Sequence, residues 1–174
     1  MFGVCDGHGP EGHFVSRFLA DVFPKCLKRI LKKEEFDIPE LIVTKVKEAV
    51  KITVRQIKHE RKIDAFNSGS TLTAIILTPN CLYSVNIGDS RTIKITNRSY
   101  FQLTTDHKPS VFEEKQRIFS KGGRVIQLRA GKRLGQSRVY LKGISAPGLA
   151  ISRSFGDFGV TGIGVISVPE VKVW

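Results

Sequence analysis

The stretch STLTAIILTPNCLYSVNIG, which spans Ser70–Gly88, contains two runs of apolar and β-branched residues separated by Pro79-Asn80. β-branched side chains favour strands, and a Pro-Asn pair between two such runs is a turn signal. The stretch therefore predicts a β-hairpin. This hairpin decides the fold class of the second half of the chain, because further strand-like runs follow it.

The sequence after the hairpin predicts more strands and two short helices. One helix is expected over residues 110–123, where Gly122-Gly123 ends it, and a last short helix is expected to lead into Asp157. Turn residues at Gly88-Asp89-Ser90 and Asn97-Arg98-Ser99 separate the strands. Further strands are expected at residues 1–4, 91–96, 101–105, 124–128 and 138–141.

Two amphipathic helices are expected before the hairpin. Between residues 11 and 33, apolar side chains recur at every fourth position from Phe14 to Ile30, although Pro24 predicts a kink or a split. Asp37 and Pro39 then open a second, cleaner helix. Helices followed by strands in tight hairpins predict an α+β fold with antiparallel sheets, formed by residues 1–174 as a single domain.

The composition is that of an ordinary globular protein, since 41% of the 174 residues are hydrophobic and 25% are charged. No apolar run is long enough to predict a membrane-spanning helix, and the N-terminal residues MFGVCDGHGP lack the pattern of a signal peptide. The three isolated cysteines predict reduced thiols rather than disulfides or a zinc site. A cytoplasmic or nuclear protein is therefore expected.

The net charge of +12 raises the question of a nucleic-acid partner. Basic residues are spread along the chain and mixed with acids, as in LKRILKKEEFD, and no nucleic-acid recognition module is present. We therefore expect a solvated basic surface, with no nucleic-acid and no membrane partner. Such a charge still favours acidic or phosphorylated partners by electrostatic steering. The sequence has no signal for the oligomeric state.

Three aspartates, Asp6, Asp89 and Asp157, lie beside glycines at the ends of expected elements. In Asp6-Gly7-His8, a carboxylate is followed by a glycine carbonyl, and both are oxygen ligands of the kind that hard divalent cations prefer. The imidazole of His8 can donate a proton near neutral pH. Each motif alone also fits an ordinary turn, so a carboxylate cluster depends on whether the three meet in the fold.

Asp157-Phe158-Gly159 is the tripeptide that holds magnesium in protein kinases, but the rest of a kinase signature is missing. The chain has no VAIK-like lysine, HRD-type loop or Walker motif. It also has no GxSxG elbow and no CxxxxxR loop, so neither serine nor cysteine stands in a nucleophile motif. For phosphate chemistry, the sequence supports only a metal-activated water as the nucleophile.

Seven blocks in chain order extend from Phe2 to Val171: FGVCDGHGP, SGSTLTAIIL, LYSVNIGDSR, LTTDHKP, RIFSKGGRV, PGLAISRSFGD and GVISVPEV. This series resembles the signature blocks of the metal-dependent type-2C serine/threonine protein phosphatases. The resemblance implies a β-sandwich of two antiparallel sheets flanked by helices, with two Mn²⁺ or Mg²⁺ ions at one end. It also implies that a water activated by both metals hydrolyses phosphoserine and phosphothreonine in a phosphorylated protein substrate.

The same resemblance implies a role for each matching residue. Asp6 matches the carboxylate that bridges both metals, and Gly7 matches the residue whose backbone carbonyl binds one of them. His8 matches the proposed general acid, and Asp157 matches a terminal ligand of the second metal. Asp89 matches the acid of a third, weaker metal site that some members have. The segment 105–109 begins the flap beside the active site.

Two family features have no counterpart in the chain. The family places a phosphate-binding Arg and an acidic pair before the Asp-Gly-His block, and a further aspartate after the PEV element. We therefore expect an incomplete phosphatase domain, truncated at both ends, that holds metal weakly and has little or no activity. The alternative is a catalytically dead phosphatase-like interaction module, although Asp6, Gly7, His8 and Asp157 are all intact.

Overall fold

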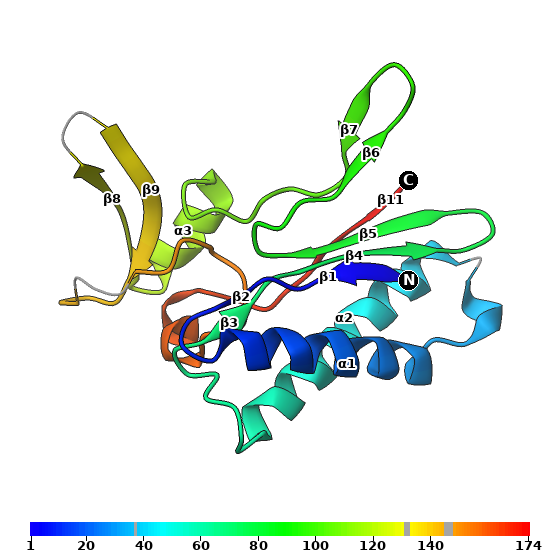
Figure 1. The fold of residues 1–174 in the computed structure, drawn as a ribbon, viewed down its shortest axis with the longest axis horizontal. Coiled ribbons are helices and arrows are strands. Elements are labelled where there is room, and N and C mark those ends of the chain that lie inside the picture. The colour runs from blue at the N-terminus through cyan, green and yellow to red at the C-terminus, as the bar shows by residue number, and fades with distance from the viewer. Residues whose placement is uncertain (37, 131–132, 145–147) are drawn as a thin grey trace.

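A computed structural model describes residues 1–36, 38–130, 133–144 and 148–174 of the chain (Figure 1). Asp37 of the predicted helix start and Pro147 of the block PGLAISRSFGD lie outside the described residues. The helical elements are α1 (Gly12–Ile30), η1 (Lys33–Glu35), α2 (Pro39–His59), α3 (Phe112–Ser120) and η2 (Phe158–Ile163). The strands are β1 (Phe2–Val4), β2 (Gly7–His8), β3 (Gly69–Ser70), β4 (Leu72–Leu77), β5 (Leu82–Ile87), β6 (Ile93–Ile95), β7 (Tyr100–Gln102), β8 (Arg124–Ala130), β9 (Arg133–Tyr140), β10 (Phe155–Gly156) and β11 (Glu170–Val173).

The predicted hairpin is confirmed as β4 and β5, which occupy the centre of a four-stranded antiparallel sheet with the order β1-β4-β5-β11. Its register runs from Leu72 opposite Ile87 to Leu77 opposite Leu82. Most side chains of both strands are buried, because the helices cover one face and the loop that continues from β7 crosses the other. The sheet therefore forms the rigid centre from which the site segments extend.

Helices α1 and α2 lie side by side on one face of this sheet (Figure 1). Their buried side chains include Leu19, Phe23 and Val46, which pack in one core with Tyr83 and the rest of the sheet face. The predicted split at Pro24 is wrong, since α1 runs through it without interruption. An interior proline costs about 3 kcal/mol. Each fully buried large apolar side chain contributes about 1.5–3 kcal/mol. The buried residues on both sides of Pro24 thus outweigh its cost.

The strands after β5 pair locally rather than extending the sheet. β6 pairs with β7 and β8 pairs with β9, each as a two-stranded antiparallel unit. β9 begins at Arg133, earlier than the predicted 138–141, because its register with β8 extends toward the hairpin tip. The predicted α+β class with antiparallel sheets is confirmed. The two layered sheets that the resemblance implied correspond, among the described residues, to one four-stranded sheet and three smaller ones.

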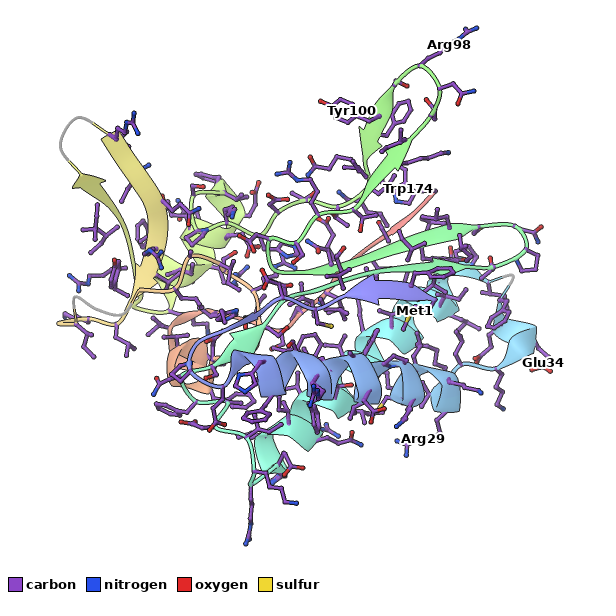
Figure 2. The ribbon with its side chains drawn as sticks, in the orientation of Figure 1. Met1, Arg29, Glu34, Arg98, Tyr100 and Trp174 are labelled. Atoms are coloured by element: carbon purple, nitrogen blue, oxygen red, sulfur yellow. The ribbon has the colours of Figure 1, made fainter. Side chains whose placement is uncertain are left out.

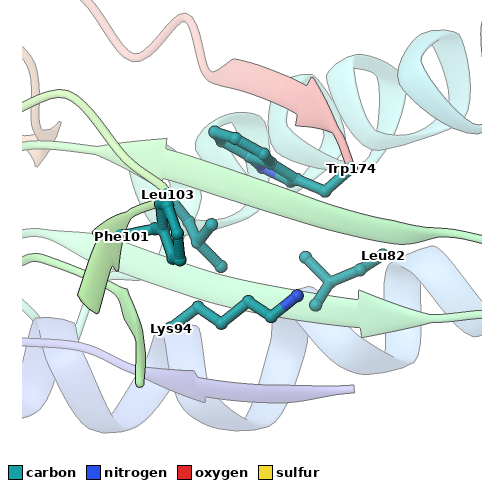
Figure 3. A pocket seen from close by; sticks show the side chains of 5 residues that line it. All are labelled: Leu82, Lys94, Phe101, Leu103 and Trp174. Carbon is teal, nitrogen blue, oxygen red and sulfur yellow. The ribbon is translucent and has the colours of Figure 1, made fainter. Parts of the chain in front are cut away.

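The β6–β7 hairpin projects from the sheet, and Arg98 and Tyr100 extend from it into solvent (Figure 2). A pocket of about 280 Å³ separates this hairpin from the C-terminal residue, and it is lined by Leu82, Lys94, Phe101, Leu103 and Trp174 (Figure 3). The β6–β7 hairpin lies away from β2 and β3 (Figure 1). Within the described ranges, no helix combines the length and the apolar character needed to cross a membrane.

Candidate functional site

A short sheet with the strand order β10-β3-β2 brings three distant parts of the chain together. Gly69 pairs with His8 on one side and with Gly156 on the other, and all three strands are antiparallel to their neighbours. The predicted helix before Asp157 is wrong. Gly156 has a φ of 79°, outside the range of a right-handed helix, and β10 pairs with β3 instead. The pairing places the residues that follow β10 beside β2.

His8 and Asp157 meet at this sheet. His8 Nε2 lies 2.6 Å from Asp157 Oδ2, and Ser154 Oγ donates a hydrogen bond of 2.5 Å to the same oxygen. The side chain of Asp157 is 7% exposed, whereas that of His8 is 29% exposed. A nearly buried carboxylate is therefore held between two donors, one of which reaches the surface.

Gly69 allows this close approach because it has no side chain. A Cβ at this position would lie 2.2 Å from Asp157 Oδ2, 2.5 Å from Ser154 Oγ and 2.7 Å from His8 Nε2. Such distances are far below van der Waals contact, so even alanine would displace at least one of the three groups. The polar trio thus packs directly on the backbone of β3.

Asp157 has a strained backbone, with a φ of 48° in the left-handed region. It is the one non-glycine residue with positive φ in the described part of the chain. This conformation costs roughly 1–2 kcal/mol for a non-glycine residue. Its N–H donates to the carbonyl of Ser68 at 2.9 Å, and its carbonyl accepts from Val160 at 2.9 Å, so neighbouring backbone holds the strain. Strain of this kind is typical of functional sites.

Asp6 and Gly7 continue the same edge of the site. The backbone of Asp6 is bonded twice to Thr71, through its carbonyl at 2.9 Å and through its N–H to Thr71 Oγ1 at 3.1 Å. Gly7 packs against the start of α1, where an added Cβ would lie 2.1 Å from the carbonyl oxygen of Gly12. Asp6 itself is exposed. The backbone is therefore fixed while the carboxylate faces solvent.

Asp89 lies in a separate turn and does not join the His8–Asp157 pair. Its carboxylate forms an ion pair with Lys108, and Ser90 Oγ lies 2.6 Å from Thr71 Oγ1. Thr71 thus connects this turn to the backbone of Asp6. The segment 105–109, where the resemblance placed the start of the flap, supplies the partner of Asp89.

His107 is buried behind the Asp89 turn. Its ring Nδ1 accepts a hydrogen bond from the backbone N–H of Gly88 at 3.1 Å, and the backbone N–H of His107 donates to the carbonyl of Gly88 at 2.9 Å. Burial, together with the positive charge of Arg153, lowers the pKa of His107 from 6.5 to about 4. The imidazole is therefore neutral at pH 7 and serves as a structural acceptor for the turn.

Glu114 is a buried acid that the sequence analysis missed, and it organises the segment before Asp157. It accepts hydrogen bonds from Arg117, Arg153 and Ser152 Oγ, while its side chain is only 3% exposed. Burial alone would raise the pKa of this carboxyl, but the hydrogen bonds from both arginines and Ser152 hold it well below its usual range. Glu114 lies one helical turn before the buried Ile118 and therefore on the same face of α3. This spacing is the sequence signal that could have predicted a buried acid.

Ser154 and Gly69 were also missed, because each matters only through contacts with distant residues. Three oxygen donors of the kind that divalent cations prefer are the carboxylates of Asp6 and Asp157 and the carbonyl of Gly7. Asp6 precedes β2 and Asp157 follows β10, and these two strands flank β3. Among residues that the structure describes, no group of three or more His, Cys, Asp or Glu is placed to hold a metal ion. Two carboxylates and one carbonyl match the small number of protein ligands in Mg²⁺ sites whose other ligands are water and phosphate oxygens.

The fold and site together describe an α+β protein that presents a His–Asp pair beside oxygen donors at the junction of three short strands. Residues 1–174 match the family model for Protein phosphatase 2C, so the chain belongs to that family. It is 37% identical over 188 residues to Probable protein phosphatase 2C 34 of Arabidopsis thaliana, a match that covers 97% of this chain and 51% of the relative. It is 38% identical over 181 residues to Probable protein phosphatase 2C 64 of Oryza sativa subsp. japonica, covering 100% of this chain and 42% of that protein.

A solved structure supports the same fold. The crystal structure of serine-threonine phosphatase 2C from Toxoplasma gondii aligns with a TM-score of 0.81 and 24% identity, covering 99% of this chain and 62% of that chain. The chain spans about half the length of the plant relatives that it matches. The family and the fold are thus shown on independent grounds.

Proposed function

We propose that the protein hydrolyses phosphoserine and phosphothreonine in phosphorylated proteins with the help of Mn²⁺ or Mg²⁺. The weak or absent activity that the sequence predicts for residues 1–174 stays a prediction, and the phosphate-release assay below tests it. The observation that carries this proposal is the meeting of His8 and Asp157 across β3, with Gly7 on β2 and Asp6 directly before it. The names of the plant relatives and the family match support a protein phosphatase. We also assign residues 1–174 to one phosphatase domain.

Asp6, the Gly7 carbonyl and Asp157 are the residues that would hold two cations, and Asp89 is a candidate for a third, weaker site. Such cations supply an acidified water as nucleophile and positive charge beside the phosphate. The protein's own contribution is placement. Thr71 fixes the backbone of Asp6, while Ser154 orients the carboxylate of Asp157.

His8 is the proton donor in this proposal. Its Nε2–H donates to Asp157 Oδ2, because an ionised carboxylate oxygen can only accept. The ring is about one-third exposed, with 29% of its side-chain surface accessible, so a substrate oxygen can approach it. Protonation of the departing serine or threonine oxygen by such a group typically contributes roughly 10²- to 10⁴-fold in rate.

The test combines metal binding with phosphate release. Electron paramagnetic resonance would count Mn²⁺ ions bound to the chain, and a phosphothreonine peptide would report release of inorganic phosphate with Mn²⁺ or Mg²⁺. We expect Asp6→Asn and Asp157→Asn to lose bound Mn²⁺ and phosphate release. Asp21→Asn on the exposed face of α1 is the matched control and should retain both.

The outcomes of this experiment test the metal site and the hydrolysis separately. If the unaltered chain binds no Mn²⁺, or if Asp157→Asn binds it equally well, the proposed metal site is wrong. If Mn²⁺ binds at Asp6 and Asp157 but no phosphate is released, hydrolysis by this chain is excluded and the interaction module is favoured.

A further inference from the structure

One segment of the chain carries basic residues with no acidic residue among them. Residues 121–142 contain seven of the 28 Lys and Arg residues of the chain and none of its 16 Asp and Glu residues. The basic residues of the segment are Lys121, Arg124, Arg129, Lys132, Arg133, Arg138 and Lys142. A high local density of one sign generates a field that the mixed charges elsewhere do not.

The segment contains the paired strands β8 and β9, and this β8–β9 hairpin extends away from the four-stranded sheet (Figure 1). Lys121, Arg133 and Lys142 are exposed. Across the described ranges, no salt bridge involves a residue of this hairpin. Arg138 donates to the carbonyl of Gly148, and Arg124 donates to the carbonyls of Leu141 and Ile144. Since carbonyls are neutral, these contacts leave the positive charge of the hairpin uncompensated.

The base of the hairpin is attached to the segment that leads to Asp157. Val139 and Leu149 exchange backbone hydrogen bonds of 2.8 and 3.0 Å, and Arg138 holds Gly148 at 2.7 Å. From there the chain passes directly to β10. In Figure 1 the hairpin projects from the end of the molecule where β2 and β3 lie, far from the two termini. The base of the hairpin is therefore joined to the segment that carries Asp157.

We propose that the β8–β9 hairpin binds an acidic segment of the protein substrate, next to the phosphorylated residue. This inference rests on the proposed function and adds the class of substrate. A protein segment is favoured because the positive surface is joined to the site, so residues flanking a bound phosphoserine or phosphothreonine would pass over it. Exposed Leu128 and Leu134 supply apolar contact area between the cations.

The test measures binding separately from catalysis. A fluorescently labelled, unphosphorylated peptide rich in Asp and Glu would be titrated with the chain, and anisotropy would report its Kd. The variant Lys121→Gln/Arg133→Gln/Lys142→Gln removes three exposed charges from the hairpin and its base. Three exposed ion pairs of ordinary strength correspond to about tenfold in affinity, so the Kd should rise by that factor. Added salt should weaken binding to the unaltered chain in the same direction.

A matched control removes the same charge elsewhere. Lys28, Lys47 and Lys51 are exposed on α1 and α2, and Lys28→Gln/Lys47→Gln/Lys51→Gln should leave the Kd unchanged. Equal weakening by both triple variants would show that net charge alone binds the peptide, and the proposal would be wrong. Tighter binding of duplex DNA or of phosphatidylserine vesicles than of the acidic peptide, lost in the hairpin variant, would also overturn it.

Hydrolysis of p-nitrophenyl phosphate distinguishes this inference from the proposed function. This small substrate has no flanking residues, so both triple variants should hydrolyse it at the rate of the unaltered chain. Peptide binding at the hairpin without any hydrolysis would contradict the proposed reaction and leave the acidic-segment site in place. Hydrolysis with no preference for the acidic peptide would contradict the hairpin site alone.

Discussion

Glu114 and Arg153 lie 39 residues apart and form a two-armed ion pair inside the protein, with Arg153 Nη2 and Nε at 2.6 and 3.0 Å from Glu114 Oε1. Arg117 approaches the same carboxylate from within α3, and it also donates to the carbonyl of Ser152 at 2.9 Å. The cluster therefore ties α3 to the segment that carries Ser154 and Asp157. It positions the site without touching the His8–Asp157 pair.

Substitution Glu114→Gln should destabilise the protein strongly. It leaves two arginines facing each other without a carboxylate, and removal of one partner of a buried ion pair typically costs about 3–5 kcal/mol. We expect a fall of this order in the free energy of unfolding, measured by urea denaturation. Glu113→Gln, one residue earlier and exposed, should change it by less than about 0.5 kcal/mol. Equal effects of the two variants would contradict a structural role for the cluster.

The same carboxyl should contribute to acid unfolding. Its folded pKa is depressed below the usual 4.5, so its contribution to stability is present above that pH and is lost as the pH falls further. Urea denaturation of the unaltered chain should therefore show stability declining steeply below about pH 4.5. Glu114→Gln should show a shallower decline there. An identical pH dependence in both proteins would show that the folded carboxyl has an ordinary pKa.

His107 should make the protein less stable between neutral and mildly acidic pH. Its pKa is 6.5 when exposed and about 4 when folded, so the unfolded chain takes up a proton that the folded chain does not. Stability is fully present above pH 6.5 and falls by up to about 1.4 kcal/mol per pH unit as the pH drops toward 4. In His107→Asn, which keeps an acceptor for the N–H of Gly88, this slope should be absent. His59→Asn at the exposed end of α2 should retain it.

Gly69→Ala should impair the site more than the fold. The new methyl group would collide with Asp157 Oδ2, Ser154 Oγ and His8 Nε2, and a displacement of about 1 Å in a catalytic group can lower the rate about 100-fold. We expect a loss of that order in metal-dependent phosphate release, with a stability loss of about 1–3 kcal/mol. Gly162→Ala is the control, because nothing lies within 4 Å of its Cβ. Unchanged turnover in Gly69→Ala would refute the tight packing described here.

His8→Gln should remove proton donation while preserving the fold. Glutamine can still donate a hydrogen bond to Asp157 but cannot transfer a proton at neutral pH. The rate of phosphate release from a phosphothreonine peptide should fall roughly 10²- to 10⁴-fold, with the melting temperature little changed. His13→Gln, on the exposed face of α1, should retain full activity. Retention of activity in His8→Gln would exclude His8 as the general acid.

The sequence predicted those elements whose signals are local. The β4–β5 hairpin follows from β-branched runs around Pro79-Asn80, and α1 and α2 follow from helical periodicity. The motif around Asp6 and His8 was found because carboxylate, glycine and imidazole stand together in the chain. Where neighbouring residues alone determine a structure, their physical chemistry is enough to predict it.

The remainder depends on contacts that no short window contains. Strands β3 and β10 have two residues each, too few for any periodicity, and they exist because they pair with each other. The sequence predicts a helix over residues 152–154. In the structure, Ser152 and Arg153 instead donate hydrogen bonds to the distant Glu114. Tertiary pairing, together with the positive φ of Gly156, overrides the local preference there.

The placement of β3 between β2 and β10 also determines when the site can arise during synthesis. The chain emerges from its N-terminus, so α1, α2 and the β4–β5 hairpin can associate while β10 has not yet been made. At that stage His8 has no partner carboxylate, because Asp157 lies 149 residues further along the chain. A nascent chain that stalls before Asp157 thus has the helical layer and strands β1, β4 and β5, but it lacks β11 and the His8–Asp157 pair. The His8–Asp157 pair therefore forms only after the helical layer and the β4–β5 hairpin have been synthesised.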